Sequence, residues 1–262
     1  MAYTKEEFKQ LVDDIQSQSW YKNPIGFGIA KVDRGQINKD KILQATFPLI
    51  NWNENFGSAA VLLNALKVAG VDVDTSKSEL VAKISDEFLT SCIEAFRPFI
   101  PEAKGDAHKN VQVISTLASL PIDSGLTGDD YRVVFIFEDV APESTEAVYL
   151  KLYALSTGKA ALRSLNLTGA FGKLHNCAWV GNQPIELDWL RANEIVLKLS
   201  GKYPNIDMVD KFPRFLQHII PADNTRILET SKVRMGAQLA AGTTVMPGAA
   251  YVNFNAGTLG SV

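Results

Sequence analysis

Residues 227–251 read ILETSKVRMGAQLAAGTTVMPGAAY, and large side chains recur in this stretch at every sixth position. A small side chain precedes most of them by two residues, and glycine follows the middle three by three residues. An α-helix repeats about every 3.6 residues and a strand about every 2, so neither explains a period of six. The three registers are Ile227, Val233, Leu239, Val245 and Tyr251; Ser231, Ala237, Thr243 and Ala249; and Gly236, Gly242 and Gly248.

A six-residue period is typical of a triangular solenoid, in which each hexapeptide forms one short parallel strand and a corner. Three hexapeptides complete a coil, the large residues stack inside the prism, and glycine relieves the backbone at the turns. We therefore predict that residues 223–262 form the first coils of a parallel β-helix. The period does not fix the hand of that helix, and right-handed crossovers are the general rule for parallel strands.

The preceding residues, 1–222, alternate helical and strand-like patterns and predict a mixed α/β domain. Apolar residues at helical spacing predict helices over 5–18, 58–69, 80–96, 142–157 and 187–199. Runs of β-prone residues predict strands over 25–33, 111–117 and 131–137. The order of these strands in a sheet does not follow from the sequence.

The composition argues against several classes of partner. The net charge is -3, and the chain has no basic run, so we expect no binding to nucleic acid. No window approaches the ~18 consecutive apolar residues of a membrane span, and the N-terminus is polar and acidic. We therefore expect a cytoplasmic protein without a membrane partner. Cys92 and Cys177 are isolated, which favours two buried free thiols over a disulfide.

The six-residue period breaks after Tyr251, because Gly257 stands where the repeat assigns an aliphatic residue. Breaks of this kind mark loops that leave the prism, and such loops often carry function. Asn253 and Asn255 bring side-chain donors and acceptors to this point. They either contact a ligand or only satisfy the backbone at a corner, since Asn tolerates the left-handed region and bonds its own main chain.

The sequence lacks the motifs of several other kinds of site. The three histidines, His108, His175 and His218, lie outside the hexapeptide register, and no CxxC occurs, so we expect no metal site in the coils. Residues 26–28 (GFG) lack the third glycine of a dinucleotide-binding loop, because Lys31 stands in its place. The chain also contains neither a P-loop motif nor a GxSxG motif.

Several stretches resemble the tetrahydrodipicolinate N-succinyltransferases, and more specifically the longer-chain branch of that family. They are residues 233–237 (VRMGA), 242–247 (GTTVMP), 251–258 (YVNFNAGT), 148–152 (VYLKL), 165–167 (LNL) and 169–174 (GAFGKL). The resemblance covers about residues 130–262. It implies a homotrimer of left-handed parallel β-helices, each preceded by an α/β domain, with active sites between neighbouring subunits.

The resemblance also implies an activity, the transfer of a succinyl group from succinyl-CoA to the amino group of ring-opened tetrahydrodipicolinate in lysine and diaminopimelate biosynthesis. Succinyl-CoA would be a co-substrate, with no permanently bound cofactor and no metal. Asn253, Asn255 and Arg234 would bind substrate. The carboxylate that manages the proton in this family is expected beyond Val262, so we expect this chain alone to be an incomplete enzyme.

Two alternatives to the succinyltransferase stay open. In one, the α/β domain binds a ligand and the β-helix serves only to form a trimer, without catalysis. In the other, the protein is a different CoA-dependent N-acyltransferase. The match of residues 253–255 to the family favours the succinyltransferase over both.

Overall fold

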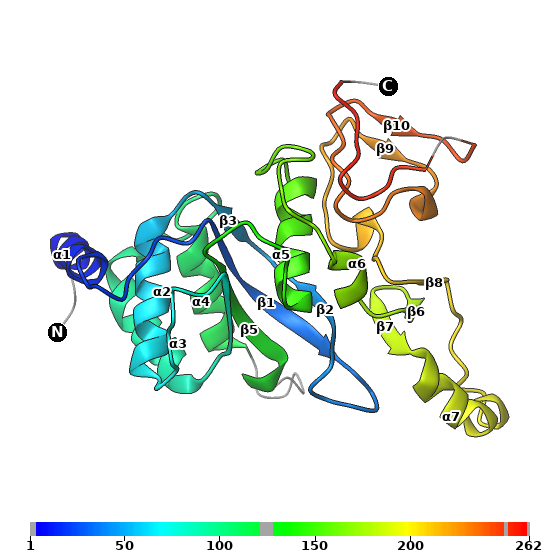
Figure 1. Ribbon diagram of the computed structural model, residues 1–262, viewed down its shortest axis with the longest axis horizontal. Coiled ribbons are helices and arrows are strands. Elements are labelled where there is room, and N and C mark those ends of the chain that lie inside the picture. Colours follow the sequence, from blue (N-terminus) through cyan, green and yellow to red (C-terminus); the bar gives the residue numbers. More distant parts are fainter. Residues whose placement is uncertain (1–3, 121–127, 249–250, 261–262) are drawn as a thin grey trace. The chain divides into compact units, whose positions relative to one another are not determined.

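Figure 1 shows the computed structural model of the chain, which describes residues 4–120, 128–248 and 251–260. Ala249, of the small-residue register, and Val262 lie outside the described residues. The chain divides into two compact units, Met1–Lys31 with Phe47–Asp139 and Val32–Thr46 with Val140–Val262. The boundary between residues 222 and 223 follows a different criterion, the start of the hexapeptide register, and stays a prediction.

An antiparallel sheet lies at the centre of the first unit. β1 (Gly26–Arg34) pairs with β3 (Ile50–Trp52) and with β5 (Tyr131–Ile136), and β4 (Glu79–Lys83) pairs with the other side of β5. The side chains of Val133 and Phe135 on β5 are fully buried. The predicted strands at 25–33 and 131–137 are therefore confirmed, each to within one residue at either end.

Helices supply the rest of the core of this unit, and they are α1 (Lys5–Gln16), α2 (Phe56–Val68), α3 (Asp86–Phe96) and α4 (Lys109–Ser119). α1 begins at a capping box in which the Thr4 hydroxyl accepts from the Glu7 backbone N–H at 3.1 Å. Among the described residues, no helix is both long enough and apolar enough to cross a membrane.

Two predicted elements of this unit were wrong. Residues 111–117 belong to helix α4 and not to a strand, because burying Val111 and Ile114 on one helical face outweighs their β-propensity. The predicted helix over 80–96 is interrupted, since its first residues form β4 beside β5. The helix starts only after Ser85, whose hydroxyl accepts from the Phe88 backbone N–H at 3.2 Å.

The glycines of the GFG stretch are explained by close packing and not by a nucleotide. A Cβ added to Gly26 would lie 2.5 Å from the ring of Trp52, and one added to Gly28 would lie 2.8 Å from the carbonyl oxygen of Leu49. Only glycine allows the backbone of β1 to approach so closely at these two positions.

Helix α5 (Thr145–Ser156) runs through the second unit, and all of its residues are buried. It packs against β2 (Ile42–Thr46) and begins three residues after the predicted Pro142, because Ser144 supplies the N-cap. The remaining elements before the coils are α6 (Ala170–Lys173), β6 (Cys177–Val180), β7 (Gln183–Glu186), α7 (Leu187–Leu199) and β8 (Met208–Asp210), with β6 between β7 and β8.

The prediction of two buried free thiols is confirmed. Cys92 in α3 and Cys177 in β6 are both buried, and neither forms a disulfide. Burial in apolar surroundings raises the pKa of both thiols, so both remain protonated at neutral pH.

After residue 225 the chain returns alongside itself in parallel. β9 (Arg226–Ile227) pairs with β10 (Thr244–Val245), so that Ile227 and Val245 are direct partners. Single parallel bridges join Val233 to Val252 and Gln238 to Gly257. The chain thus meets itself again about three hexapeptides later at three successive hexapeptides.

Burial along these returns follows the hexapeptide register in part. Val233 and Val245 are buried, and so are the small residues Ala237 and Thr243. Leu239 was expected inside but is only half-buried, because it borders a surface cavity that Ile219 and Pro221 also line. Tyr251, the last large residue of the register, is exposed.

A chain of polar side chains crosses the interior of the second unit. The Tyr153 hydroxyl lies 2.7 Å from Nδ1 of His218, whose Nε2 lies 2.9 Å from Oε1 of Gln44. The Gln44 amide donates to Asp33 at 2.6 Å and to the carbonyl of Asn182 at 2.9 Å. Since the Gln44 oxygen can only accept, His218 carries its proton on Nε2 and accepts the Tyr153 hydroxyl at Nδ1.

Replacing Gly236 by alanine should destabilise the first coil. Gly236 has φ +90°, and an added Cβ would lie 2.6 Å from Cδ2 of Leu152 and 2.9 Å from Cβ of Phe254. We expect a loss of about 2 kcal/mol in the free energy of unfolding, measured by urea titration. Gly248→Ala is the matched control, because nothing lies within 4 Å of its added Cβ. Equal stability of the two variants would contradict the packing described.

Acid should destabilise the protein through His218. Burial lowers the pKa of His218 from 6.5 to about 3 in the folded state. The unfolded chain therefore takes up this proton first as the pH falls, and stability that is complete above pH 6.5 is lost towards pH 3. The slope should approach about 1.4 kcal/mol per pH unit. Urea titrations between pH 7.5 and 4.5 should show a shallower slope for His218→Gln than for the parent, and equal slopes would contradict this role of His218.

Candidate functional site

The break in the hexapeptide register lies directly against the preceding coil. The Val252 backbone N–H donates to the Lys232 carbonyl at 2.7 Å, and the Asn255 N–H donates to the Gly236 carbonyl at 2.8 Å. Between these bonds, the ring of Phe254 stacks on Phe212, with centroids 4.4 Å apart and an interplanar angle of 9°. These backbone bonds and this aromatic contact hold the segment against the preceding coil.

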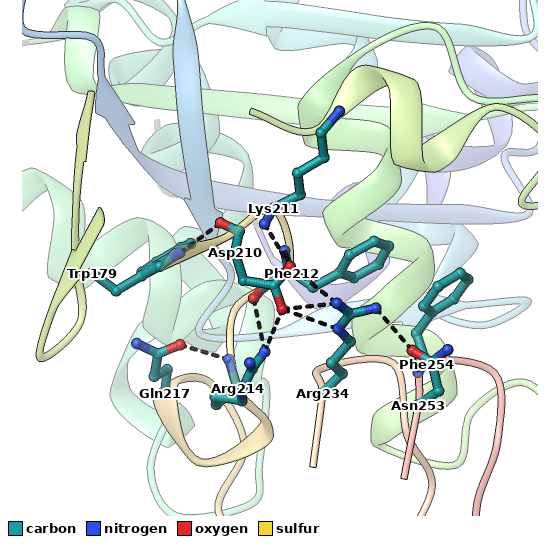
Figure 2. A network of polar contacts seen from close by, with 9 residues as sticks. All are labelled: Trp179, Asp210, Lys211, Phe212, Arg214, Gln217, Arg234, Asn253 and Phe254. Atoms are coloured by element: carbon teal, nitrogen blue, oxygen red, sulfur yellow. Dashed lines mark hydrogen bonds and ion pairs between the residues drawn. The ribbon is translucent and has the colours of Figure 1, made fainter. Parts of the chain in front are cut away.

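A single carboxylate, Asp210 at the end of β8, binds two arginines beside this segment. Figure 2 shows the guanidinium groups of Arg214 and Arg234 converging on it. Arg214 Nη1 lies 2.8 Å from Oδ2, and Arg234 Nη2 lies 3.0 Å from Oδ1 and 2.9 Å from Oδ2. The Trp179 indole N–H donates to the carbonyl of Asp210 at 2.9 Å and fixes its backbone.

The two arginines keep Asp210 ionised. Burial by itself would raise the pKa of this carboxyl, but the hydrogen bond from Arg214 and the charge of Arg234 lower it below its ordinary value. The carboxylate side chain is only 11% exposed, so these bonds are poorly screened by water. Sequence reasoning missed Asp210, because a single aspartate in a separate stretch of the chain from Arg234 gives no signal in the pattern.

Arg234, expected to bind substrate, forms several contacts within the protein. Its guanidinium lies over the rings of Phe212 and Tyr251, at 5.2 and 5.5 Å from their centroids. Nη1 donates to Oδ1 of Asn253 at 3.2 Å, so Arg234 joins Asp210 to the loop. The side chain is 20% exposed.

Asn255 satisfies a backbone group, which is one of the two roles that the sequence left open. Its backbone is left-handed, with φ +57°, and its Oδ1 accepts the backbone N–H of Arg163 at 2.6 Å. Oδ1 of Asn253 likewise accepts hydrogen bonds from protein donors, which are the Arg234 guanidinium and the Phe254 N–H. The amide nitrogens of both asparagines have no hydrogen-bond partner among residues 4–120, 128–248 and 251–260 and remain available as donors.

The three histidines are not part of this hydrogen-bonded cluster. His218 is bound to Tyr153 and Gln44, and burial lowers the pKa of His175. His108, in the first unit, lies 3.7 Å from the Glu102 carboxylate. Within the described part of the chain, no group of three or more His, Cys, Asp or Glu side chains is placed to hold a metal ion.

Comparison with known protein families accounts for most of the chain. Residues 6–172 match the model for the N-terminal domain of tetrahydrodipicolinate N-succinyltransferase, and residues 174–214 match the model for its middle domain. The chain belongs to the tetrahydrodipicolinate N-succinyltransferase family. The sequence alone had shown this resemblance only from about residue 130 onwards, whereas the family match begins at residue 6.

Relatives within the tetrahydrodipicolinate N-succinyltransferase family are similar over the whole chain. Proteins from Sulfurovum sp. and Campylobacter jejuni, both named 2,3,4,5-tetrahydropyridine-2,6-dicarboxylate N-succinyltransferase, are 65% and 55% identical over 98% and 100% of the chain. The chain spans 64% and 66% of their lengths. A C. jejuni crystal structure, assigned as a 2,3,4,5-tetrahydropyridine-2-carboxylate N-succinyltransferase, superposes with a TM-score of 0.93 at 55% identity, over 100% of this chain and 66% of that one.

Removing the charge of Asp210 should destabilise the second unit strongly. In Asp210→Asn the guanidinium groups of Arg214 and Arg234 stay largely buried but lose their carboxylate, and we expect a loss of about 3 kcal/mol in the free energy of unfolding. Asp188→Asn is the control, because the Asp188–Arg191 pair is 81% and 70% exposed and should contribute less than about 1 kcal/mol. Urea titration of both variants measures the difference, and equal midpoints would argue against the assigned role of Asp210.

Proposed function

We propose that the protein carrying this chain transfers a succinyl group from succinyl-CoA to the amino group of ring-opened tetrahydrodipicolinate, in lysine and diaminopimelate biosynthesis. The observation that carries the proposal is 65% identity, over 98% of the chain, to a protein named for this N-succinyl transfer. The match extends through the coil and the loop that hold Asn253 and Asn255. Succinyl-CoA is the co-substrate, and no resident cofactor is invoked.

The coils at the C-terminal end are proposed to be the start of a left-handed parallel β-helix. Their support is the six-residue register together with the parallel pairing of successive returns of the chain on three sides. We propose further that the protein assembles as a homotrimer with its active sites between subunits, as the family resemblance implies, and acts in the cytoplasm.

Asn253 and Asn255 are proposed to bind substrate through their amide nitrogens, since their oxygens are occupied by protein donors. Arg234 is proposed to contribute to the same site, with its guanidinium held in place by Asp210. Acyl transfer to an amine requires a base for the amine and polarisation of the thioester carbonyl. No base is assigned among the described residues.

The activity is tested by measuring free CoA released from succinyl-CoA by the full-length protein, with and without tetrahydrodipicolinate. Release that depends on tetrahydrodipicolinate supports the proposal. Light scattering on the same preparation should give the mass of three chains. A trimer that binds the dicarboxylate without releasing CoA would favour the non-catalytic alternative, and release with a different amine only would favour another N-acyltransferase.

Substitution of Asn255 separates a role of its side-chain amide from the requirement for a left-handed backbone. Asn255→Gly keeps the left-handed backbone and loses the amide, whereas Asn255→Ala loses the amide and strains the backbone. If the amide binds substrate, both variants and Asn253→Ala should lose about tenfold or more in kcat/KM.

If the amide binds the substrate and the transition state equally, KM should rise while kcat is unchanged. If it acts only in the transition state, kcat should fall. Full activity in Asn255→Gly, with reduced stability in Asn255→Ala alone, would leave Asn255 with a purely structural role.

A further inference from the structure

Arg163 adopts a backbone conformation that is uncommon for its residue type. Its φ is +63°, in the left-handed region that L-residues other than Asn, Asp and His seldom occupy. Such a conformation costs free energy and persists only where surrounding contacts impose it. The imposing contact is identifiable, because the Arg163 backbone N–H donates to Oδ1 of Asn255 at 2.6 Å.

The turn that holds Arg163 is anchored on the same return segment as Asn255. The Ser164 backbone N–H and hydroxyl both donate to the Ala161 carbonyl, at 3.2 and 2.7 Å, and close the turn. Cδ1 of Leu162 lies 3.1 Å from the position that a Cβ would take on Gly257. The turn therefore packs against residues 255–257, and the side chain of Arg163 begins next to Asn255.

The charge of Arg163 is uncommitted, unlike that of the two arginines beside Asp210. Arg214 and Arg234 share one carboxylate at 2.8–3.1 Å. Arg163 is exposed, and among the described residues its guanidinium forms no hydrogen bond or ion pair. Asn253 thus binds the guanidinium of Arg234, whereas Asn255 binds the backbone of Arg163. The guanidinium of Arg163 is left free.

The acyl acceptor in the names of the relatives is a 2,6-dicarboxylate, which carries two negative charges. A guanidinium group presents a planar fork of N–H donors that matches a carboxylate and binds it through two hydrogen bonds. We propose that Arg163 recognises one carboxylate of the acyl acceptor and so selects dicarboxylates, an inference that rests on the proposed function. Asn255 is the positioning residue, because it holds the backbone from which Arg163 extends.

Arg163→Gly in the full-length protein tests the assignment, since glycine keeps the left-handed backbone and removes only the side chain. We expect KM for tetrahydrodipicolinate to rise by about 10- to 100-fold, with kcat and KM for succinyl-CoA changed less than about twofold. Arg163→Lys keeps the charge without the fork and should lie between the parent and Arg163→Gly. The preference of the parent for a dicarboxylate over an amino acid with one carboxylate should be lost in Arg163→Gly.

Arg191→Ala is the matched control, because it removes an exposed arginine that is already paired with Asp188 and should leave all constants unchanged. Urea midpoints for each variant verify folding. An unchanged KM for the acceptor in both Arg163 variants would overturn the inference, and so would a rise confined to KM for succinyl-CoA, which would assign the anion to that co-substrate. An inactive parent protein would instead defeat the proposed function, so the two failures are distinguishable.

Discussion

Two guanidinium groups share one poorly exposed carboxylate in the second unit, and the placement of the candidate site depends on that arrangement. Asp210 ends β8, Arg214 follows it by four residues, and Arg234 belongs to the first coil. A charge removed from water is costly unless it is paired, so neither arginine can leave Asp210 without a large penalty. This constraint fixes the coil against β8, and through Arg234 it fixes the loop at Asn253.

Packing against α5 supplies the second constraint on the site. Because every residue of α5 is buried, its side chains admit little adjustment in the segments around them. Leu152 of α5 comes so near Gly236 that no Cβ fits there, and the Ser156 hydroxyl accepts the Gly236 N–H at 2.8 Å. The next return of the chain is then set by the bond from Asn255 N–H to the Gly236 carbonyl. The loop that departs from the hexapeptide register is therefore placed by a rigid neighbour.

These constraints give the polar residues of the site different functions. Arg234 and the oxygens of both asparagines are occupied by bonds within the chain. Of the described residues discussed for this site, the anchored Arg234, the amide nitrogens of the two asparagines and the guanidinium of Arg163 are the groups proposed to meet a ligand, and all of them are donors. A site of donors suits an anionic substrate, which agrees with the dicarboxylate named in the relatives of the family.

The sequence by itself determined the features that a short local pattern encodes. The six-residue register identified the coil region, apolar residues at helical spacing located α1 and α7, and the β-prone run at 131–137 located β5. Where two local patterns conflicted, tertiary contacts decided. Residues 111–117 became a helix because one face is buried in the core, and residues 79–83 became a strand because β5 offered an edge to pair with. The bonds from Asp210 to Arg234 and from Asn255 to Arg163 join residues that are distant in the sequence, and only the folded chain shows them. Charge pairing and hydrogen bonding act over a few ångströms in space, and no periodicity along the sequence records which distant residues will meet.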